Sequence, residues 1–291
     1  MSRPATEKMR IVALDDRALL RLGGADRVDF LQGLVSNDVK RLEKEPAIYA
    51  ALLSPQGKLL FDFFVIAAAG HLLIDCPASQ SADLMRRLLM YRLRAAVDID
   101  AVGDQARLYA ALPTAGGTPP PTPDDGVLAY RDPRDRRMGW RLIAGEAWQP
   151  DGNSFRPATI ADYRAVQMAL AIPDSTGDLR PGKDFPAECN FERLNAVDFD
   201  KGCFIGQELT ARIHYRGKLK KRLIALRATP PLPAGSTDMA ITLNGREVGH
   251  IRSARGSLAM AMCRVGVLEG SGLRAGDSQL SPLSNEDTAD E

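Results

Sequence analysis

The pattern of apolar residues changes at Leu223, and this change limits the possible folds more than any other feature of the chain. Beyond it, short alternating segments are separated by the proline-rich residues 230–233 and by Asn244-Gly245. Asn-Gly between alternating segments is a strong hairpin signal, because both residues accept a positive φ. We therefore expect short β-strands and at least one hairpin over residues 217–277, followed by a disordered acidic tail at 278–291.

Before residue 217 the chain mixes helical and strand patterns. Residues 79–94 form the clearest predicted helix, since Leu84, Leu88 and Tyr91 make one apolar stripe. Strand patterns flank this helix, and a strand–turn–strand pattern precedes it over residues 49–67. Another helix is expected at 159–169. This order of elements predicts an α+β fold built from split βαβ, ferredoxin-like units.

Length and composition indicate a globular protein with one large and one small domain. The chain has 291 residues, of which 45% are hydrophobic and 26% charged, so disorder and fibrous folds are excluded. The large domain is predicted to cover residues 1–216, with a Pro-rich surface loop at 113–126. A net charge of +1 excludes the global basic field of a dedicated nucleic-acid binder.

The four cysteines do not predict a metal site. None stands in a Cys-x-x-Cys motif, and the chain has only three histidines. Neither a zinc site nor a cluster bound by this chain alone is expected, because such sites use grouped ligands. The sequence shows no signal peptide and no apolar run of about 20 residues that would span a bilayer. We therefore expect a cytoplasmic protein without a membrane partner.

The candidate reactive group is Cys203, at the centre of residues 201–208, Lys-Gly-Cys-Phe-Ile-Gly-Gln-Glu. Gly202 and Gly206 allow backbone conformations through which a ligand or a neighbouring strand can come close. The ammonium of Lys201 would favour the thiolate of Cys203, the nucleophilic and metal-binding form. A buried, inert cysteine is the alternative for a lone Cys.

This octapeptide resembles the signature of the folate-binding YgfZ family, relatives of the glycine-cleavage T-protein. The resemblance implies a T-protein-like folate-binding fold with a small C-terminal antiparallel β-barrel over residues 217–277. It also implies tetrahydrofolate as cofactor, and a role in supporting iron–sulfur enzymes and, through them, tRNA modification. It also implies that Cys203 and Lys201 carry the reactive chemistry. Whether Cys203 would hold a cluster, carry sulfur or exchange electrons is left open.

The resemblance extends to residues that would line a folate cavity. Glu188 matches the glutamate that accepts hydrogen bonds from the pterin ring, whose adjacent N–H groups suit a carboxylate. Asn37 lies at the end of the early helix, and Arg164 lies in a helix that enters the cavity. Asp62 remains where T-proteins have adjacent acids, and Gln207 belongs to the signature. Plain turn chemistry for Asn37, and an outward position for Asp62, are the alternatives.

Two other functions stay open. The first is tetrahydrofolate-dependent aminomethyl transfer, for which Asp62 is the single remaining acid because Phe61 replaces its neighbour. The second is tRNA binding by residues 212–222, where several basic side chains surround Tyr215. The expected partners are folate, iron–sulfur client enzymes and, in the last case, tRNA.

Overall fold

The fold is described from a computed structural model, which places residues 8–114, 126–217, 219–267 and 272–283. The chain separates into two compact units. The first comprises Met1–Gln32, Val39–Ala50 and Phe63–Tyr163, and the second comprises Gly33–Asp38, Ala51–Asp62 and Arg164–Glu291. The predicted domain boundary at residue 216 stays a prediction.

The first unit contains a five-stranded sheet with the order β10-β1-β7-β9-β8. Its strands are β1 (Met9–Ala13), β7 (Ala106–Leu112), β8 (Leu128–Arg131), β9 (Trp140–Gly145) and β10 (Phe155–Pro157). β1 pairs in parallel with β10 and antiparallel with β7. Alternate residues such as Met9 and Ile11 point into the apolar core of this sheet, as a half-buried strand requires.

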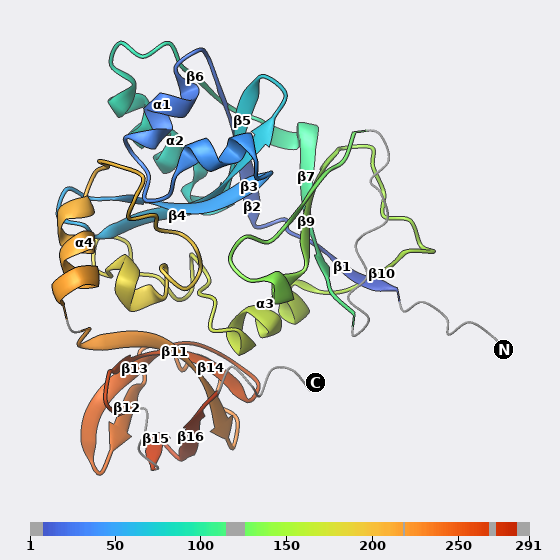
Figure 1. The fold of residues 1–291 in the computed structure, drawn as a ribbon. Coiled ribbons are helices and arrows are strands. Elements are labelled where there is room, and N and C mark those ends of the chain that lie inside the picture. Colours follow the sequence, from blue (N-terminus) through green and yellow to red (C-terminus); the bar gives the residue numbers. More distant parts are fainter. Residues whose placement is uncertain (1–7, 115–125, 218, 268–271, 284–291) are drawn as a thin grey trace. The chain divides into compact units, whose positions relative to one another are not determined.

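A second five-stranded sheet has the order β3-β4-β5-β2-β6. It is formed by β2 (Arg17–Gly23), β3 (Ala47–Leu53), β4 (Leu59–Ala68), β5 (His71–Pro77) and β6 (Asp98–Ala101), and β3 and β4 contribute residues to both units. Helix α2 (Ser81–Arg92) connects β5 to β6, and β2 lies between these two strands (Figure 1). The predicted split βαβ arrangement is confirmed.

The apolar stripe of the predicted helix is the face that the helix buries, as its spacing indicates. Leu84 and Leu88 of α2 are fully buried, and Tyr91 is half-buried. The other short elements that begin before residue 163 are α1 (Arg27–Gln32), η1 (Val39–Glu43), η2 (Ala78–Gln80), η3 (Gly103–Gln105), η4 (Arg136–Met138) and α3 (Ile160–Ala169). Most of the predicted Pro-rich loop, residues 115–125, lies outside the described residues.

A buried network of charges lies inside the first unit. Asp75 is fully buried and accepts hydrogen bonds from Arg17 Nε at 2.7 Å and from Arg141 Nη2 at 2.5 Å. Burial alone would raise the pKa of Asp75, but Arg141 and Arg17 lower it below its ordinary value. The Tyr163 hydroxyl accepts a further bond from Arg141 at 2.9 Å. Each charge is thus matched, as burial demands.

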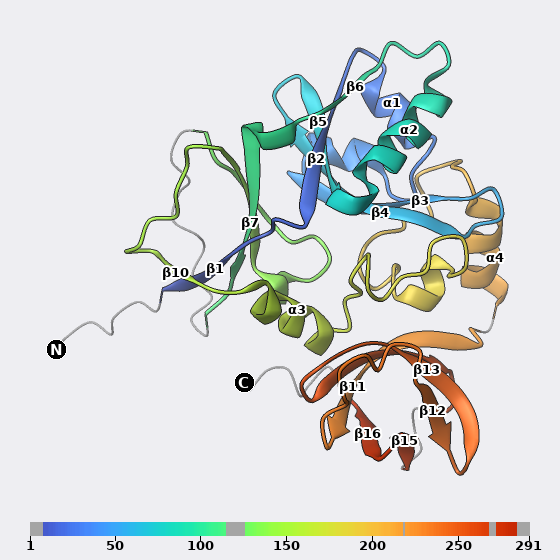
Figure 2. The same cartoon turned by 180° about the vertical axis from the view of Figure 1, so that it is seen from behind.

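The second unit contains η5 (Pro186–Cys189), α4 (Gln207–Arg216) and a closed barrel (Figure 2). The barrel order is β11-β14-β13-β12-β15-β16. Its strands are β11 (Lys221–Thr229), β12 (Ala240–Leu243), β13 (Arg246–Arg255), β14 (Leu258–Arg264), β15 (Leu273–Ala275) and β16 (Ser278–Pro282). Between β12 and β13, Asn244 and Gly245 have φ values of 51° and 74°, which confirms the predicted hairpin.

The prediction of a disordered tail from residue 278 is wrong for its first residues. β16 pairs with both β11 and β15 and so completes the barrel. Only Ser278 and Leu280 of this strand are buried, and one of the two is polar. The alternation of buried and exposed residues is therefore too short to predict a strand from the sequence. Residues 284–291 lie outside the described part of the chain.

Candidate functional site

Cys203 is exposed, whereas Cys76, Cys189 and Cys263 are buried. Burial raises the pKa of the Cys189 thiol, and it raises that of Cys263 to about 12. Buried thiols with raised pKa values are poor nucleophiles and poor metal ligands. Cys203 is therefore the one thiol of this chain that is placed to react with a partner.

Cys203 lies on a loop, residues 199–206, that we call the thiol loop. Its last residue, Gly206, has a φ of 82° and is the N-cap of α4. A Cβ atom at Gly206 would lie 2.4 Å from the carbonyl oxygen of Ser54, at the tip of the β3–β4 hairpin. Only glycine allows this backbone-to-backbone contact. The predicted close approach of a neighbouring segment is thus seen at Gly206.

Lys201 and Gln207 bond to the backbone around the loop. The Lys201 ammonium donates to the carbonyl of Val35 at 2.6 Å, and burial lowers the pKa of Lys201 to about 8, although Asp38 and Asp198 oppose this. Gln207 Oε1 accepts a hydrogen bond from the Phe204 N–H at 3.1 Å. Both side chains hold the loop in shape. Their predicted roles, beside the thiol and on folate, stay predictions.

Glu188 lies on η5 and is 8% exposed. Its Oε2 atom accepts a hydrogen bond from the Phe185 N–H at 3.2 Å and lies 3.3 Å from Lys221 Nζ. The described residues place no donor on its other oxygen, Oε1. Glu188 is thus a partly buried carboxylate with one free oxygen, which fits one N–H of a pterin edge.

A second buried acid, Asp184, stands next to Glu188. It accepts a hydrogen bond from Arg252 Nη2 of β13 at 2.9 Å and lies 4.0 Å from Lys221 Nζ. Arg252 Nη1 is buried without a hydrogen-bond partner among the described residues. Sequence reasoning missed Asp184 and Arg252, because the two residues lie 68 positions apart and neither belongs to a motif.

Asp62 and Asn37 are buried and make hydrogen bonds within the second unit. Asp62 Oδ2 accepts a bond from the Ser175 hydroxyl at 2.6 Å, so its side chain is not an outward one on a half-exposed strand. Asn37 Nδ2 donates to the carbonyl of Asn195 at 2.7 Å, and its Oδ1 accepts from the Asp38 N–H. The helix-end turn chemistry considered for Asn37 is present.

Arg164 lines a cavity of about 60 Å³. It lies 3.1 Å from Asp174 Oδ1 and donates to Gln167 at 2.7 Å. Asp178 lines the same cavity and accepts a bond from the Ser253 hydroxyl at 2.5 Å. Burial raises the pKa of Asp178 to about 6. This cavity holds a few water molecules at most. The predicted place of Arg164 at a folate stays a prediction.

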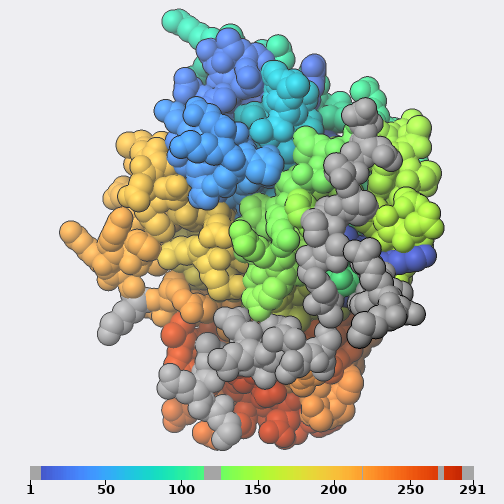
Figure 3. Space-filling view, turned by 45° about the vertical axis from the view of Figure 1, so that its right-hand side comes forward, coloured from blue at the N-terminus to red at the C-terminus, as the bar shows by residue number. Residues whose placement is uncertain are grey.

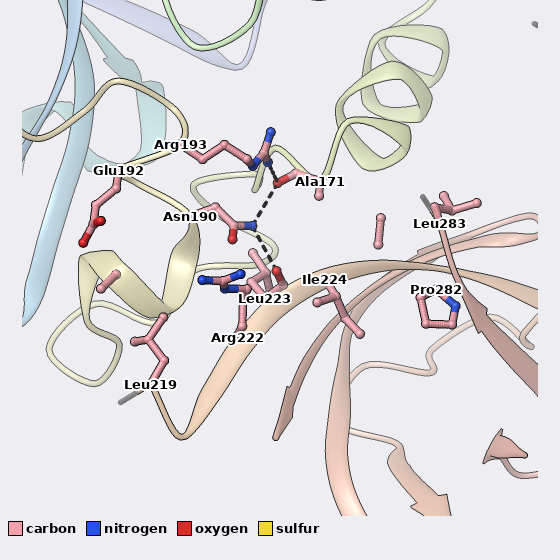
Figure 4. Close-up of a pocket in the computed structure, with 12 residues that line it drawn as sticks. Ala171, Asn190, Glu192, Arg193, Leu219, Arg222, Leu223, Ile224, Pro282 and Leu283 are labelled. Atoms are coloured by element: carbon pink, nitrogen blue, oxygen red, sulfur yellow. Dashed lines mark hydrogen bonds between the residues drawn. The ribbon is translucent and has the colours of Figure 1, made fainter. Parts of the chain in front are cut away.

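A larger cavity, of about 420 Å³, lies beside η5 and β11. Figure 4 shows the Asn190 amide and the Arg193 guanidinium meeting at the carbonyl of Ala171, where they donate at 3.3 and 2.8 Å. Asn190 also donates to the Leu223 carbonyl at 2.9 Å. Glu188 is not among the residues that line this cavity, although its neighbour Ala187 is.

Most of the predicted basic stripe is exposed. Arg212, Arg216, Lys220 and Arg222 are exposed, Lys221 is half-buried, and Lys218 lies outside the described residues. Tyr215, the predicted stacking residue, is 67% exposed. Among the described side chains, no group of three or more His, Cys, Asp or Glu is arranged to hold a metal ion. None of the described helices has the length and apolar character needed to cross a bilayer.

The fold resembles a known enzyme fold over nearly its full length. A crystal structure of the glycine cleavage system aminomethyltransferase T from Bartonella henselae matches 98% of this chain and 88% of its own, with a TM-score of 0.78 and 15% identity. Residues 220–286 match the family described as CAF17, C-terminal beta-barrel domain. The chain is therefore of the class that joins a T-protein fold to a CAF17-type barrel, and the predicted fold class is confirmed.

The sequence relatives narrow this class. The mitochondrial iron–sulfur cluster assembly factor IBA57 of Mus musculus is 33% identical, over 92% of this chain and 81% of the relative. The factor of the same name from Homo sapiens is 36% identical, over 86% and 76% respectively. The chain belongs to the IBA57 family of iron–sulfur cluster assembly factors. The predicted kinship to T-proteins and to iron–sulfur factors is confirmed, although these relatives do not carry the name YgfZ.

The prediction of a cytoplasmic location is contradicted. The relatives from Mus musculus, Homo sapiens and Pyricularia oryzae are all named as mitochondrial. The prediction rested on the missing signal peptide, which is a feature of secretion and does not separate one internal compartment from another.

Proposed function

We propose that this protein assists the assembly or repair of a subset of iron–sulfur enzymes, and that it binds tetrahydrofolate while doing so. Modification of tRNA would then depend on it through a client enzyme. The observation that carries this proposal is the exposed thiol of Cys203 in a chain whose relatives are named iron–sulfur cluster assembly factors.

The thiol would supply one ligand to a cluster that passes through the protein as cargo. One thiolate cannot saturate a cluster, and the described residues offer no grouped ligands beside it. The remaining ligands would come from the donor or the client, so the complex would be transient. A shared, incompletely held cluster is easier to release than one buried in a four-cysteine site.

Tetrahydrofolate would be recognised by Glu188. Its free Oε1 atom would accept one pterin N–H, and the second would compete with the half-exposed Lys221 for Oε2. Bound folate would bring a redox-active and one-carbon-carrying ring system to the protein. The partly buried position of Glu188 strengthens such a bond, because water competes less for it.

The first test replaces Cys203 by Ala, with Cys203→Ser as a matched variant. We expect both variants to fold with unchanged stability and to fail to restore the activity of iron–sulfur enzymes in cells that lack the protein. Native wild-type protein should react with one equivalent of a thiol reagent, and Cys203→Ala with none. A variant that restores full enzyme activity would refute the role of the thiol.

The second test measures tetrahydrofolate affinity by calorimetry. Glu188→Ala should weaken binding by about 1–3 kcal/mol, the cost of leaving a polar edge unsatisfied. Glu192→Ala is the control, because Glu192 is an exposed acid of the same segment that pairs with His214 at 3.0 Å. Equal affinities for Glu188→Ala and wild type would remove Glu188 from the folate site.

Aminomethyl transfer to tetrahydrofolate is the second candidate, and the buried carboxylate of Asp62 favours it. Turnover of an aminomethylated lipoyl carrier, lost in Asp62→Asn, would establish it. Direct tRNA binding stays a prediction, and a salt-dependent mobility shift of tRNA tests it.

A further inference from the structure

The thiol loop is fastened to α4 at both ends. Near its C-terminal end, the Phe204 N–H donates to Gln207 in the first turn of α4. At its N-terminal end, the ring of Phe199 stacks on His214 in the last turn, with ring centroids 3.8 Å apart and an interplanar angle of 20°. The exposed Cys203 lies between these two anchors. The loop therefore presents its thiol from a defined place on α4.

The anchor at His214 is the centre of an exposed aromatic cluster. Tyr215 meets His214 edge-on, with centroids 4.7 Å apart and an interplanar angle of 84°. The His214 ring is held from the other side by Glu192 at 3.0 Å. Tyr215 keeps 67% of its surface exposed although it is packed against two rings. Such a fixed, exposed aromatic side chain is typical of a binding surface.

Three exposed cations lie on α4 and just beyond it, close in sequence to this cluster. Arg212 and Arg216 of α4 and Lys220 beyond it are exposed, and none has an acidic partner in the described part of the chain. Glu208, the exposed acid of the helix, lies one turn before Arg212. The orange atoms of the α4 region project from the surface in the space-filling view (Figure 3). Exposed cations without acidic partners attract an anion from a distance.

An iron–sulfur cluster that is ligated by thiolates is an anion, because the sulfides and thiolates together outweigh the charge of the ferric ions. We propose that the exposed face of α4, formed by Arg212, Tyr215 and Arg216, is the entry site for a 2Fe–2S cluster that arrives with thiolate ligands. The face draws the anion to α4, the helix to which the loop that carries Cys203 is anchored at Phe199 and Phe204. This inference rests on the proposed function of Cys203.

The step that follows is a ligand exchange. The Cys203 thiol loses its proton and its sulfur bonds to iron, while one incoming thiolate leaves that iron and takes up the proton. The iron atoms keep their oxidation states, so the exchange needs no reductant or oxidant. The face acts before this step, by raising the local concentration of the anion.

The test uses a 2Fe–2S cluster bound by four glutathione thiolates as the probe. The uptake rate is followed by the visible circular dichroism that appears when the cluster joins the protein. At about 0.01 M salt, where charges act over about 30 Å, Arg212→Glu/Arg216→Glu should take up the cluster at least about tenfold more slowly than wild type. At about 1 M salt the two rates should converge.

A matched control reverses two exposed arginines of the barrel, Arg246→Glu/Arg274→Glu, with the same change in net charge. This control should keep the wild-type rate. Equal slowing by both pairs would reduce the effect to net charge and overturn the proposal, as would an unchanged rate in the α4 variant.

Two further outcomes separate the alternatives. If tRNA binds to α4 and the probe enters wild type and the α4 variant equally fast, the face serves nucleic acid and the proposal fails. If wild type takes up no cluster and Cys203→Ala is fully active in cells, the proposed function fails. If Cys203→Ala is inactive but Arg212→Glu/Arg216→Glu is normal in uptake, only the inference about the α4 face fails.

Discussion

Two regions of the molecule, the network around Asp75 in the first unit and the exposed residues of α4 in the second, use charged side chains in opposite ways. In the first unit, Asp75 is buried between Arg17 and Arg141, and each charge has a fixed partner. In the second unit, Arg212 and Arg216 lie in solvent on α4, the helix that follows the loop with the exposed thiol. A buried charge network commits the chain to one arrangement, since a missing partner is costly. An exposed, unmatched set leaves its partner to be supplied by another molecule.

The largest expected effect comes from breaking the buried network. Asp75→Ala leaves two arginines without their carboxylate and should lower the free energy of unfolding by about 3–5 kcal/mol. Denaturant unfolding measures it. The control is Asp100→Ala, which breaks the exposed Arg21–Asp100 pair, with side chains 52% and 57% exposed, and should cost less than about 1 kcal/mol. Similar losses in both variants would contradict the comparison.

The thiol loop offers a second contrast, between two glycines with positive φ. Gly206→Ala forces a Cβ atom against the Ser54 carbonyl and should destabilise the protein by about 2–4 kcal/mol. Gly202→Ala, at a φ of 90° with open space around it, should cost about 1 kcal/mol. Thermal and denaturant unfolding of the two variants check this order, and a reversed order would show that the loop is not held at Gly206.

A smaller effect is expected from Asp178, a buried acid that, unlike Asp75, forms no ion pair with an arginine in the described part of the chain. Burial raises the pKa of Asp178 to about 6, so between about pH 4 and pH 6 the native state keeps a proton that the unfolded chain releases. The contribution of Asp178 to stability is therefore highest below this window and falls by up to about 3 kcal/mol as the pH rises through it. Asp178→Asn should flatten this part of the stability profile. An unchanged slope would show that Asp178 is not its source.

Much of the fold could be predicted because its signals are local. The α2 stripe, the Asn244-Gly245 hairpin and the early strand–turn–strand each depend on residues close in sequence. β16 escaped prediction because its pairing with β11 joins residues about fifty positions apart and its own alternation is short. Long-range pairing leaves little trace in a local pattern.

In the candidate site, too, local features could be predicted and long-range contacts could not. The exposure of Cys203 and the close contact at Gly206 follow from a local glycine-flanked motif. The partners of Asp184 and Asp62 could not be predicted, because Arg252 and Ser175 reach them from distant segments. The sequence also indicated that Lys201 would act on the thiol. The structure shows its ammonium on the Val35 carbonyl, a partner that no spacing rule identifies.

Because Cys203 is exposed and the other three cysteines are buried, the unmodified protein can carry a fluorescent label at a single known position. A maleimide dye added to the folded chain would attach at that one position, because the remaining sulfur atoms are shielded by packing. Any molecule that settles on the adjoining helix would change the polarity and quenching around the dye. The binding of a partner molecule to this surface could then be titrated by fluorescence without any added mutation.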